Sequence, residues 1–126
     1  MRSSVILLCL ALFGCFIGLS YQQSAYTRLA SAAVKADTTA LGALNFGAQI
    51  IAEEAVDNRR IKSDDYAVSE IVSAKVNGRS YEFEAQISNA KGTNVLEGTY
   101  TVYAESANDF ILAEYDYQVV QKESFY

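Results

Sequence analysis

Apolar residues in the first half of the chain recur at helical spacing. They lie three or four positions apart and so line one face of a helix: Leu41, Leu44, Ala48, Ile51, Ala52 and Ala55. Before this stripe, Asp37-Thr38-Thr39 offers side-chain oxygens that can accept hydrogen bonds from free backbone N–H groups. After it, Asp57-Asn58-Arg59-Arg60 places arginines at the negative end of the helix dipole. The pattern predicts a helix of about five turns between residues 37 and 60.

Beyond a polar linker at Lys62–Asp65, the pattern changes to the alternation of a half-buried strand. Tyr81, Phe83, Ala85 and Ile87 alternate with polar residues. Asn77-Gly78 comes just before them, and this dipeptide can supply the two positive-φ positions of a tight hairpin. On the other side of the turn, one parity holds Val68, Val72, Ala74 and Val76, with Glu70 as the exception. The stretch Ile71–Ile87 therefore predicts a β-hairpin.

A second hairpin is predicted after a loop at Ser88–Asn94. Its strands are Val95–Ala104 and Phe110–Val119, joined by a loop at Glu105–Asp109. In the last strand one face is expected to hold Ile111, Ala113, Tyr115, Tyr117 and Val119. Because no helix separates the strands, they are expected to pair as an antiparallel meander over the helix. The predicted fold class is α+β, with one long helix packed on a four- to five-stranded antiparallel sheet.

The N-terminus has the pattern of a secretory signal peptide. Met1-Arg2 is a short positive start, Val5–Leu19 is almost wholly apolar, and Gly18-x-Ser20 provides the small residues of a cleavage site. A membrane anchor is the alternative, but the apolar run is short for a bilayer span and no basic cluster follows it. We expect residues 1–20 to be removed and the chain to be secreted to the extracellular space, without a membrane partner thereafter.

The mature chain is expected to begin with an arm. Residues 21–36 are polar and small, show no persistent period, and predict a flexible segment. Residues 37–126 then form the domain.

Composition excludes several function classes. The chain carries 10 basic and 15 acidic residues and no histidine. The negative balance argues against nucleic acid or an anionic membrane as the partner. Cys9 and Cys15 both lie in the expected signal peptide, so the mature chain would have no disulfide and no thiol. Without His or Cys there is no Ser-His or Cys-His nucleophile and no imidazole or thiolate metal site. We therefore expect a protein that is not an enzyme and uses no cofactor or metal.

Short motifs in a particular order support a resemblance to a known family. The motifs are Ala43-Leu44-Asn45-Phe46 in the helix, Ala74-Lys75-Val76-Asn77-Gly78 followed by Arg79-Ser80-Tyr81 in the hairpin, and Thr101-Val102-Tyr103-Ala104 in the third strand. They match the helix start, the Gln-x-Val-x-Gly first loop with its x-x-Tyr, and the strand before the second loop of cystatins. Over roughly residues 28 to 119 the chain therefore resembles the cystatin family.

In cystatins the N-terminal arm and two loops form a wedge that fills the active-site cleft of papain-like cysteine proteases. The resemblance implies protease-binding residues in the arm (Leu29, Ala30 and Ser31), in the first loop (Ala74, Lys75, Val76, Asn77 and Gly78) and in the second loop (Ser106 and Ala107). Ala74 replaces the family's Gln, and Ser106-Ala107 replaces its Pro-Trp; the arm lacks the family's Gly. The resemblance thus implies a weak, competitive and non-covalent inhibitor.

Several alternatives remain at this stage. The Asn77-Gly78 turn can serve the backbone alone, Glu105–Asp109 can be a solvated loop, and the arm can lack a partner. The alternative function is a non-inhibitory extracellular binding module on the same fold. A ligand pocket between helix and sheet is a further alternative. The chain is expected to be a monomer, with a domain-swapped dimer as the alternative.

Overall fold

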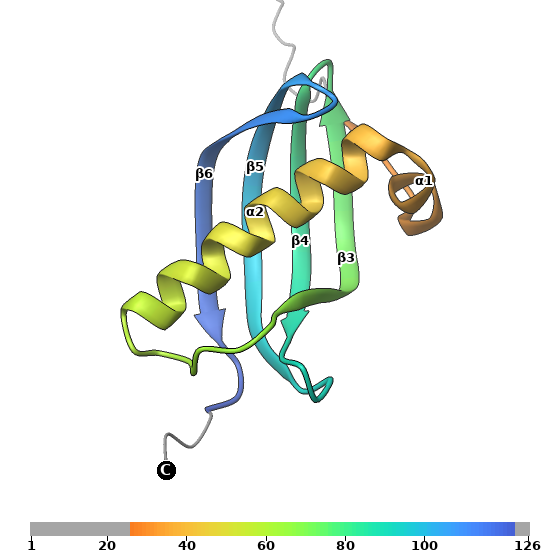
Figure 1. The fold of residues 1–126 in the computed structure, drawn as a ribbon. Helices are drawn as coiled ribbons and strands as arrows, with labels where there is room; N and C mark the ends of the chain where they lie inside the picture. Colours follow the sequence, from red (N-terminus) through yellow and green to blue (C-terminus); the bar gives the residue numbers. More distant parts are fainter. Residues whose placement is uncertain (1–25, 123–126) are drawn as a thin grey trace, which may run out of the picture.

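The computed structural model describes residues 26–122, which form one antiparallel sheet with a long helix across one face (Figure 1). Along the chain the elements are β2 (Thr27–Arg28), α1 (Ser31–Ala36), α2 (Thr38–Asp57), β3 (Ala67–Asn77), β4 (Ser80–Ser88), β5 (Asn94–Ser106) and β6 (Asp109–Val119). The strands follow the order β2-β3-β4-β5-β6, which is also their order along the chain, with α1 and α2 between β2 and β3. The α+β class and the antiparallel sheet are confirmed. The expected signal peptide at residues 1–20 lies outside the described residues, as does the start of the arm.

Helix α2 begins and ends close to the predicted positions. At its start Asp37 Oδ1 accepts hydrogen bonds from Thr39 N at 2.9 Å and Ala40 N at 3.3 Å. At its end Arg59 has a left-handed backbone with φ 58°, and Arg60 N donates to Ala55 O at 2.8 Å. This is a Schellman motif, which stops the helix through backbone bonds rather than through the arginine charges alone. Over residues 26–122, neither helix combines the length and apolarity needed to cross a membrane.

The N-cap contact at Asp37 gives a first stability prediction. Asp37→Ala removes the acceptor for two backbone N–H groups and is expected to lower the free energy of unfolding by about 1 kcal/mol. Asp37→Asn keeps an oxygen in the same place and should lose less than half as much. Urea unfolding of both variants measures the difference. Equal losses in the two variants would show that the cap bond does not stabilise the helix.

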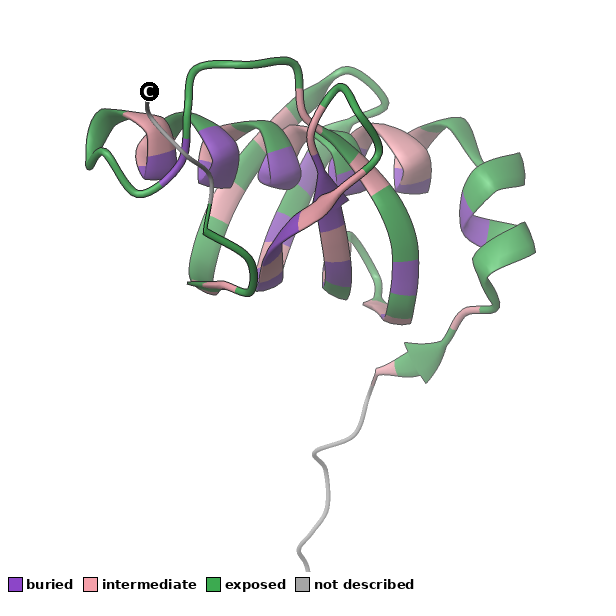
Figure 2. Cartoon of the chain, turned by 90° about the horizontal axis from the view of Figure 1, so that it is seen from below, coloured by how far each residue is buried: buried purple, intermediate pink, exposed green. Residues whose placement is uncertain are grey.

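The core lies between α2 and the sheet, and Figure 2 shows buried residues on α2 and at alternating positions along the strands. Its largest fully buried side chains include Tyr100, Phe83, Leu44 and Ile51. The Tyr100 hydroxyl donates to Leu44 O at 2.8 Å, so the ring is held against the helix. Burial raises the pKa of this phenol well above its ordinary value, so it remains a donor at physiological pH. These side chains fill the space in which a ligand pocket was an alternative.

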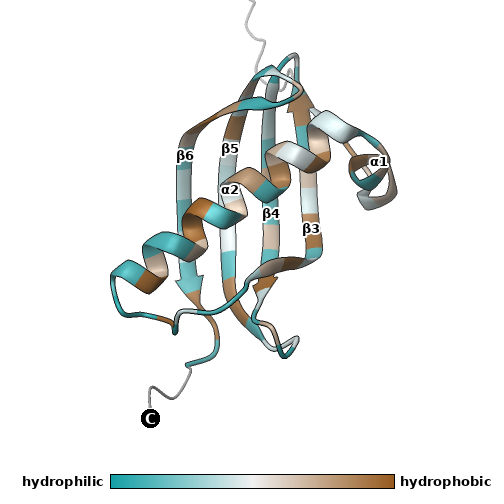
Figure 3. Cartoon of the chain, viewed as in Figure 1, coloured by the Kyte–Doolittle hydropathy of each residue, from teal (hydrophilic) through white to brown (hydrophobic). Residues whose placement is uncertain are grey.

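Figure 3 shows hydrophobic and hydrophilic residues alternating along the strands, but bulges change which residues face the core. In β3 the pairing with β4 shifts twice, between Val68 and Glu70 and between Ile71 and Ser73, which leaves Ser69 and Val72 as extra residues. Ile71 is therefore buried, whereas Val72 is 47% exposed. The prediction that Val72 shares the core parity is wrong. A bulge inserts one unpaired residue and reverses the parity of the strand beyond it, which a strict period of two cannot reveal.

A bulge also changes which residues of the last strand face the core. Thr101 pairs with Glu114 while Val102 pairs with Leu112, which leaves Ala113 as an extra residue in β6. Before this bulge Phe110 and Leu112 pack against the core, and Ile111 is 48% exposed. The prediction that Ile111 faces the core together with Tyr117 and Val119 is therefore wrong.

The end of the expected flexible arm is ordered. Thr27 and Arg28 of β2 pair with Val76 and Lys75 of β3, and the Val34 side chain of α1 is fully buried. The prediction of a flexible arm is thus wrong for its described part. A helix of six residues is too short to be stable alone, so α1 depends on tertiary contacts that leave little periodicity in the sequence.

Candidate protein-binding rim

Three segments far apart in sequence lie at one end of the sheet. The β3–β4 turn and the β5–β6 turn lie at the same end because consecutive antiparallel strands reverse direction (Figure 1). Strand β2 pairs with the last residues of β3, next to the first of these turns. We call residues 27–31, 76–80 and 105–109 together the rim. The 89–93 loop lies at the opposite end of the sheet.

The first turn of the rim is built around one glycine. Asn77 pairs with Ser80, so the two turn residues are Gly78 and Arg79. Gly78 has φ +61°, but neither Asn77 nor Arg79 has a positive φ. The prediction that Asn77 and Gly78 both adopt positive φ is wrong for Asn77. The turn lies one residue later, at Gly78 and Arg79, and only Gly78 has a positive φ. Asn77 ends the strand, and the turn needs left-handed backbone only at its first central position, where glycine is favoured.

The second turn is shorter than the predicted five-residue loop. Ser106 pairs with Asp109, which leaves only Ala107 and Asn108 between the strands. Just after it, the Phe110 ring packs at 5.6 Å from the Phe46 ring of α2. This contact attaches the turn to the first half of the helix.

Hydrogen bonds join the two turns directly. Ala104 N donates to Arg79 O at 2.8 Å, and Arg79 Nη1 donates to Glu105 O at 3.3 Å. On the other side of the first turn the arm is bonded to β3, where Leu29 N donates to Ala74 O at 2.8 Å. The rim is therefore a continuous edge fixed by backbone hydrogen bonds and by one hydrogen bond from the Arg79 side chain.

Exposure divides the residues that the family resemblance assigned to protease binding. The exposed ones are Ala30, Ser31, Asn77, Gly78, Ser106 and Ala107. Leu29, Lys75 and Val76 are half-buried, and both Leu29 and Val76 pack against the core. Ala74 is only 2% exposed and belongs to the core, so its side chain is not available to a partner. The bulge at Val72 puts Ala74 on the helix side of the sheet.

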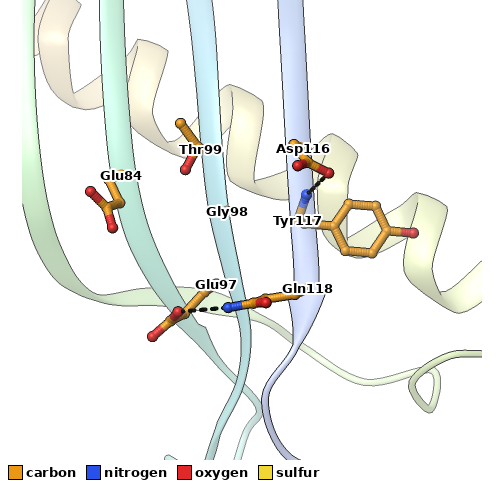
Figure 4. A pocket seen from close by; sticks show the side chains of 7 residues that line it. All are labelled: Glu84, Glu97, Gly98, Thr99, Asp116, Tyr117 and Gln118. Atoms are coloured by element: carbon orange, nitrogen blue, oxygen red, sulfur yellow. Dashed lines mark hydrogen bonds between the residues drawn. The ribbon is translucent and has the colours of Figure 1, made fainter.

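The opposite face of the sheet, which α2 does not cover, is acidic in its centre. We call it the outer face. A hollow of about 350 Å³ there is lined by residues that include Glu84, Glu97 and Asp116, shown in Figure 4 on the side away from the helix. Glu97 accepts a hydrogen bond from Gln118 Nε2 at 3.2 Å. Within residues 26–122 no group of three or more Asp, Glu, His or Cys side chains is arranged to hold a metal ion. The centre of the outer face is therefore negatively charged.

Two exposed apolar residues beside the rim were missed by sequence reasoning. Tyr103 of β5 and Ile111 of β6 are cross-strand partners, 38% and 48% exposed. The alternation of Tyr103 with Val102 and Ala104 could have placed the tyrosine on the outer face. Nothing in the sequence signalled Ile111, because the bulge at Ala113 determines its side.

Comparison with models of protein families, with curated proteins and with solved structures finds no match to this chain. The rim is therefore interpreted from its own geometry and from the motifs along the sequence.

Proposed function

We propose that this chain is a secreted cystatin-like protein that competitively and non-covalently inhibits papain-like cysteine proteases. The observation that carries the proposal is the rim itself. The arm, the first turn and the second turn form one joined edge, with exposed small residues at Gly78 and Ala107. An edge with small side chains can enter a narrow cleft and bring its backbone close to the catalytic groups.

Inhibition of this kind needs no chemistry in the inhibitor. The rim would occupy the cleft and exclude the substrate by shape. At Gly78 an added Cβ would meet nothing within 4 Å, so the approach to this residue is open. Lys75 and Val76 would lie beside it, while Leu29, Ala30 and Ser31 would contact neighbouring subsites.

The rim also explains why we expect the inhibition to be weak. Ala74 is buried, and the second turn offers only Ser106, Ala107 and Asn108. Tight interfaces usually depend on a few large anchors, above all Trp, Tyr and Arg. Loss of one such anchor costs about 2 kcal/mol or more, which corresponds to more than tenfold in affinity.

The test is a titration of residues 21–126 against papain. We expect KM for a small peptide substrate to rise with inhibitor concentration while kcat stays constant. Mass spectrometry after the assay should find the chain intact, which excludes simple competition by a second substrate. Trypsin serves as the control protease and should be unaffected. The absence of papain inhibition at ~100 μM, a concentration at which even weak complexes form, would refute the proposal.

The alternative is a non-inhibitory extracellular binding module. The small side chains of Ser106 and Ala107 favour it, because they remove the anchor that an inhibitor would use. If a protein that is not a protease is recovered from the native fluid and still binds the Gly78→Glu variant, the binding module is supported over inhibition.

A further inference from the structure

The outer face carries an apolar pair directly behind the rim. Tyr103 and Ile111 are cross-strand partners, and Tyr103 also pairs with Ser80 at the start of β4. Cross-strand partners have Cβ atoms about 5 Å apart, so the two side chains form one surface. We call this pair the flank.

The direction of the flank follows from its neighbours. Val102 and Ala104 are buried in the core on either side of Tyr103, so the tyrosine points away from the helix. The next row along the outer face is polar and of mixed charge, with partners that follow one another across the sheet: Arg28, Lys75, Glu82, Thr101 and Glu114. The flank is therefore a confined apolar patch that borders the rim on one side and a row of mixed charge on the other.

We propose that the flank is a second contact surface for the protease, packing against one wall of the cleft that the rim enters. This inference rests on the proposed function of the rim. A wedge seated in a cleft brings its two faces close to the two walls. On the helix face Phe46 and Phe110 are already half-buried against each other. On the outer face Tyr103 and Ile111 are free to bury apolar surface. A tyrosine supplies a large, rigid contact that can replace part of the anchor missing from the second turn.

The flank determines which chemical groups the wall of the protease cleft should carry. It should be apolar opposite Ile111 and should offer a hydrogen-bond acceptor to the Tyr103 hydroxyl, since a buried phenol normally finds a partner. It should carry no acidic group opposite Glu114, because like charges there would oppose binding.

A second copy of this chain fits the flank less well. Stable interfaces bury on the order of 1,200 Å² or more, far above what two side chains can supply. We therefore assign the flank to the protease.

The experiment compares inhibition constants against papain. Tyr103→Ser is expected to raise the constant about tenfold and Ile111→Thr several-fold, because each removes exposed apolar contact. Tyr103→Phe should change it less than threefold, since the ring is kept. Val120→Thr is the matched control: Val120 is 42% exposed but follows β6 at the end of the sheet opposite the rim, where its N–H donates to Val95 O, and its variant should inhibit like the wild type. Urea unfolding midpoints show whether the variants stay folded.

The outcomes separate the two proposals. If the wild type inhibits and Tyr103→Ser and Ile111→Thr inhibit equally well, the flank assignment is wrong and the rim proposal stands. If the wild type does not inhibit, both are wrong. Sedimentation that shows a wild-type dimer dispersed by Tyr103→Ser would also overturn the flank assignment in favour of a second copy.

Discussion

Replacing Gly47 by alanine is expected to lower the free energy of unfolding by about 3 kcal/mol, even though alanine is the better helix former. A Cβ at this position of α2 would lie 2.3 Å from Cδ2 and 2.5 Å from Cε2 of Tyr100. The Tyr100 ring cannot easily move away, because it is buried and its hydroxyl is bonded to Leu44 O. Helix and sheet would have to separate, and the core would lose packing along their contact.

Gly42→Ala in the same helix is the matched control. Its Cβ would lie 2.8 Å from Cζ of Phe110, which is the far end of a half-buried ring. That ring can shift, so the change should cost less than about 1 kcal/mol after the gain in helix propensity. Urea unfolding measures both variants. A Gly47→Ala protein as stable as the wild type would contradict the tight helix–sheet contact described above.

A cycle with Tyr100→Leu tests the origin of the effect. With the ring removed, Gly47→Ala should cost much less than in the wild type. Residues in direct contact typically show coupling energies of about 0.5–3 kcal/mol in such cycles.

The second large effect concerns the rim. Gly78→Glu is expected to weaken inhibition of papain about a hundredfold, or about 2.7 kcal/mol. The substitution places a charged side chain where the backbone would approach the catalytic centre, and burial of an unpaired carboxylate is costly.

Gly92→Glu provides a control with the same backbone strain. Gly92 has φ +84°, and, as at Gly78, an added Cβ would meet nothing within 4 Å. Both changes place a non-glycine residue in a left-handed conformation and should cost about 1–3 kcal/mol of folding stability. Gly92 lies in the 89–93 loop at the far end of the sheet, so its variant should inhibit like the wild type. Equal inhibition by both variants would exclude the first turn from the interface, whereas equal loss would point to a general effect on folding.

The local sequence pattern was sufficient to predict an element when its apolar residues keep one period along its whole length. The stripe of α2 and the Asp37 cap predicted the helix, and the alternation after Gly78 predicted β4 with its buried Phe83. The order of elements, with no helix between β3, β4, β5 and β6, was enough for an antiparallel meander of these four strands with both turns at one end. These features depend on neighbours in sequence, and short-range chemistry decides them.

Local pattern failed where pairing between strands decides the outcome. The bulges at Val72 and Ala113 arise from the fit of β3 to β4 and of β6 to β5, so the sequence of one strand cannot reveal them. The bulge at Val72 exposes this valine, while Ile71 is buried in the core. The bulge at Ala113 exposes Ile111 beside the rim.

The sequence by itself thus determined the helix, the strands and the turn at Gly78, because propensity, capping and periodicity act over a few residues. Only the tertiary structure decided that α1 docks through Val34, that Val72 is exposed, and that Tyr103 and Ile111 form an exposed pair. The reason is physical: burial and strand register depend on surfaces that meet only after the chain has folded.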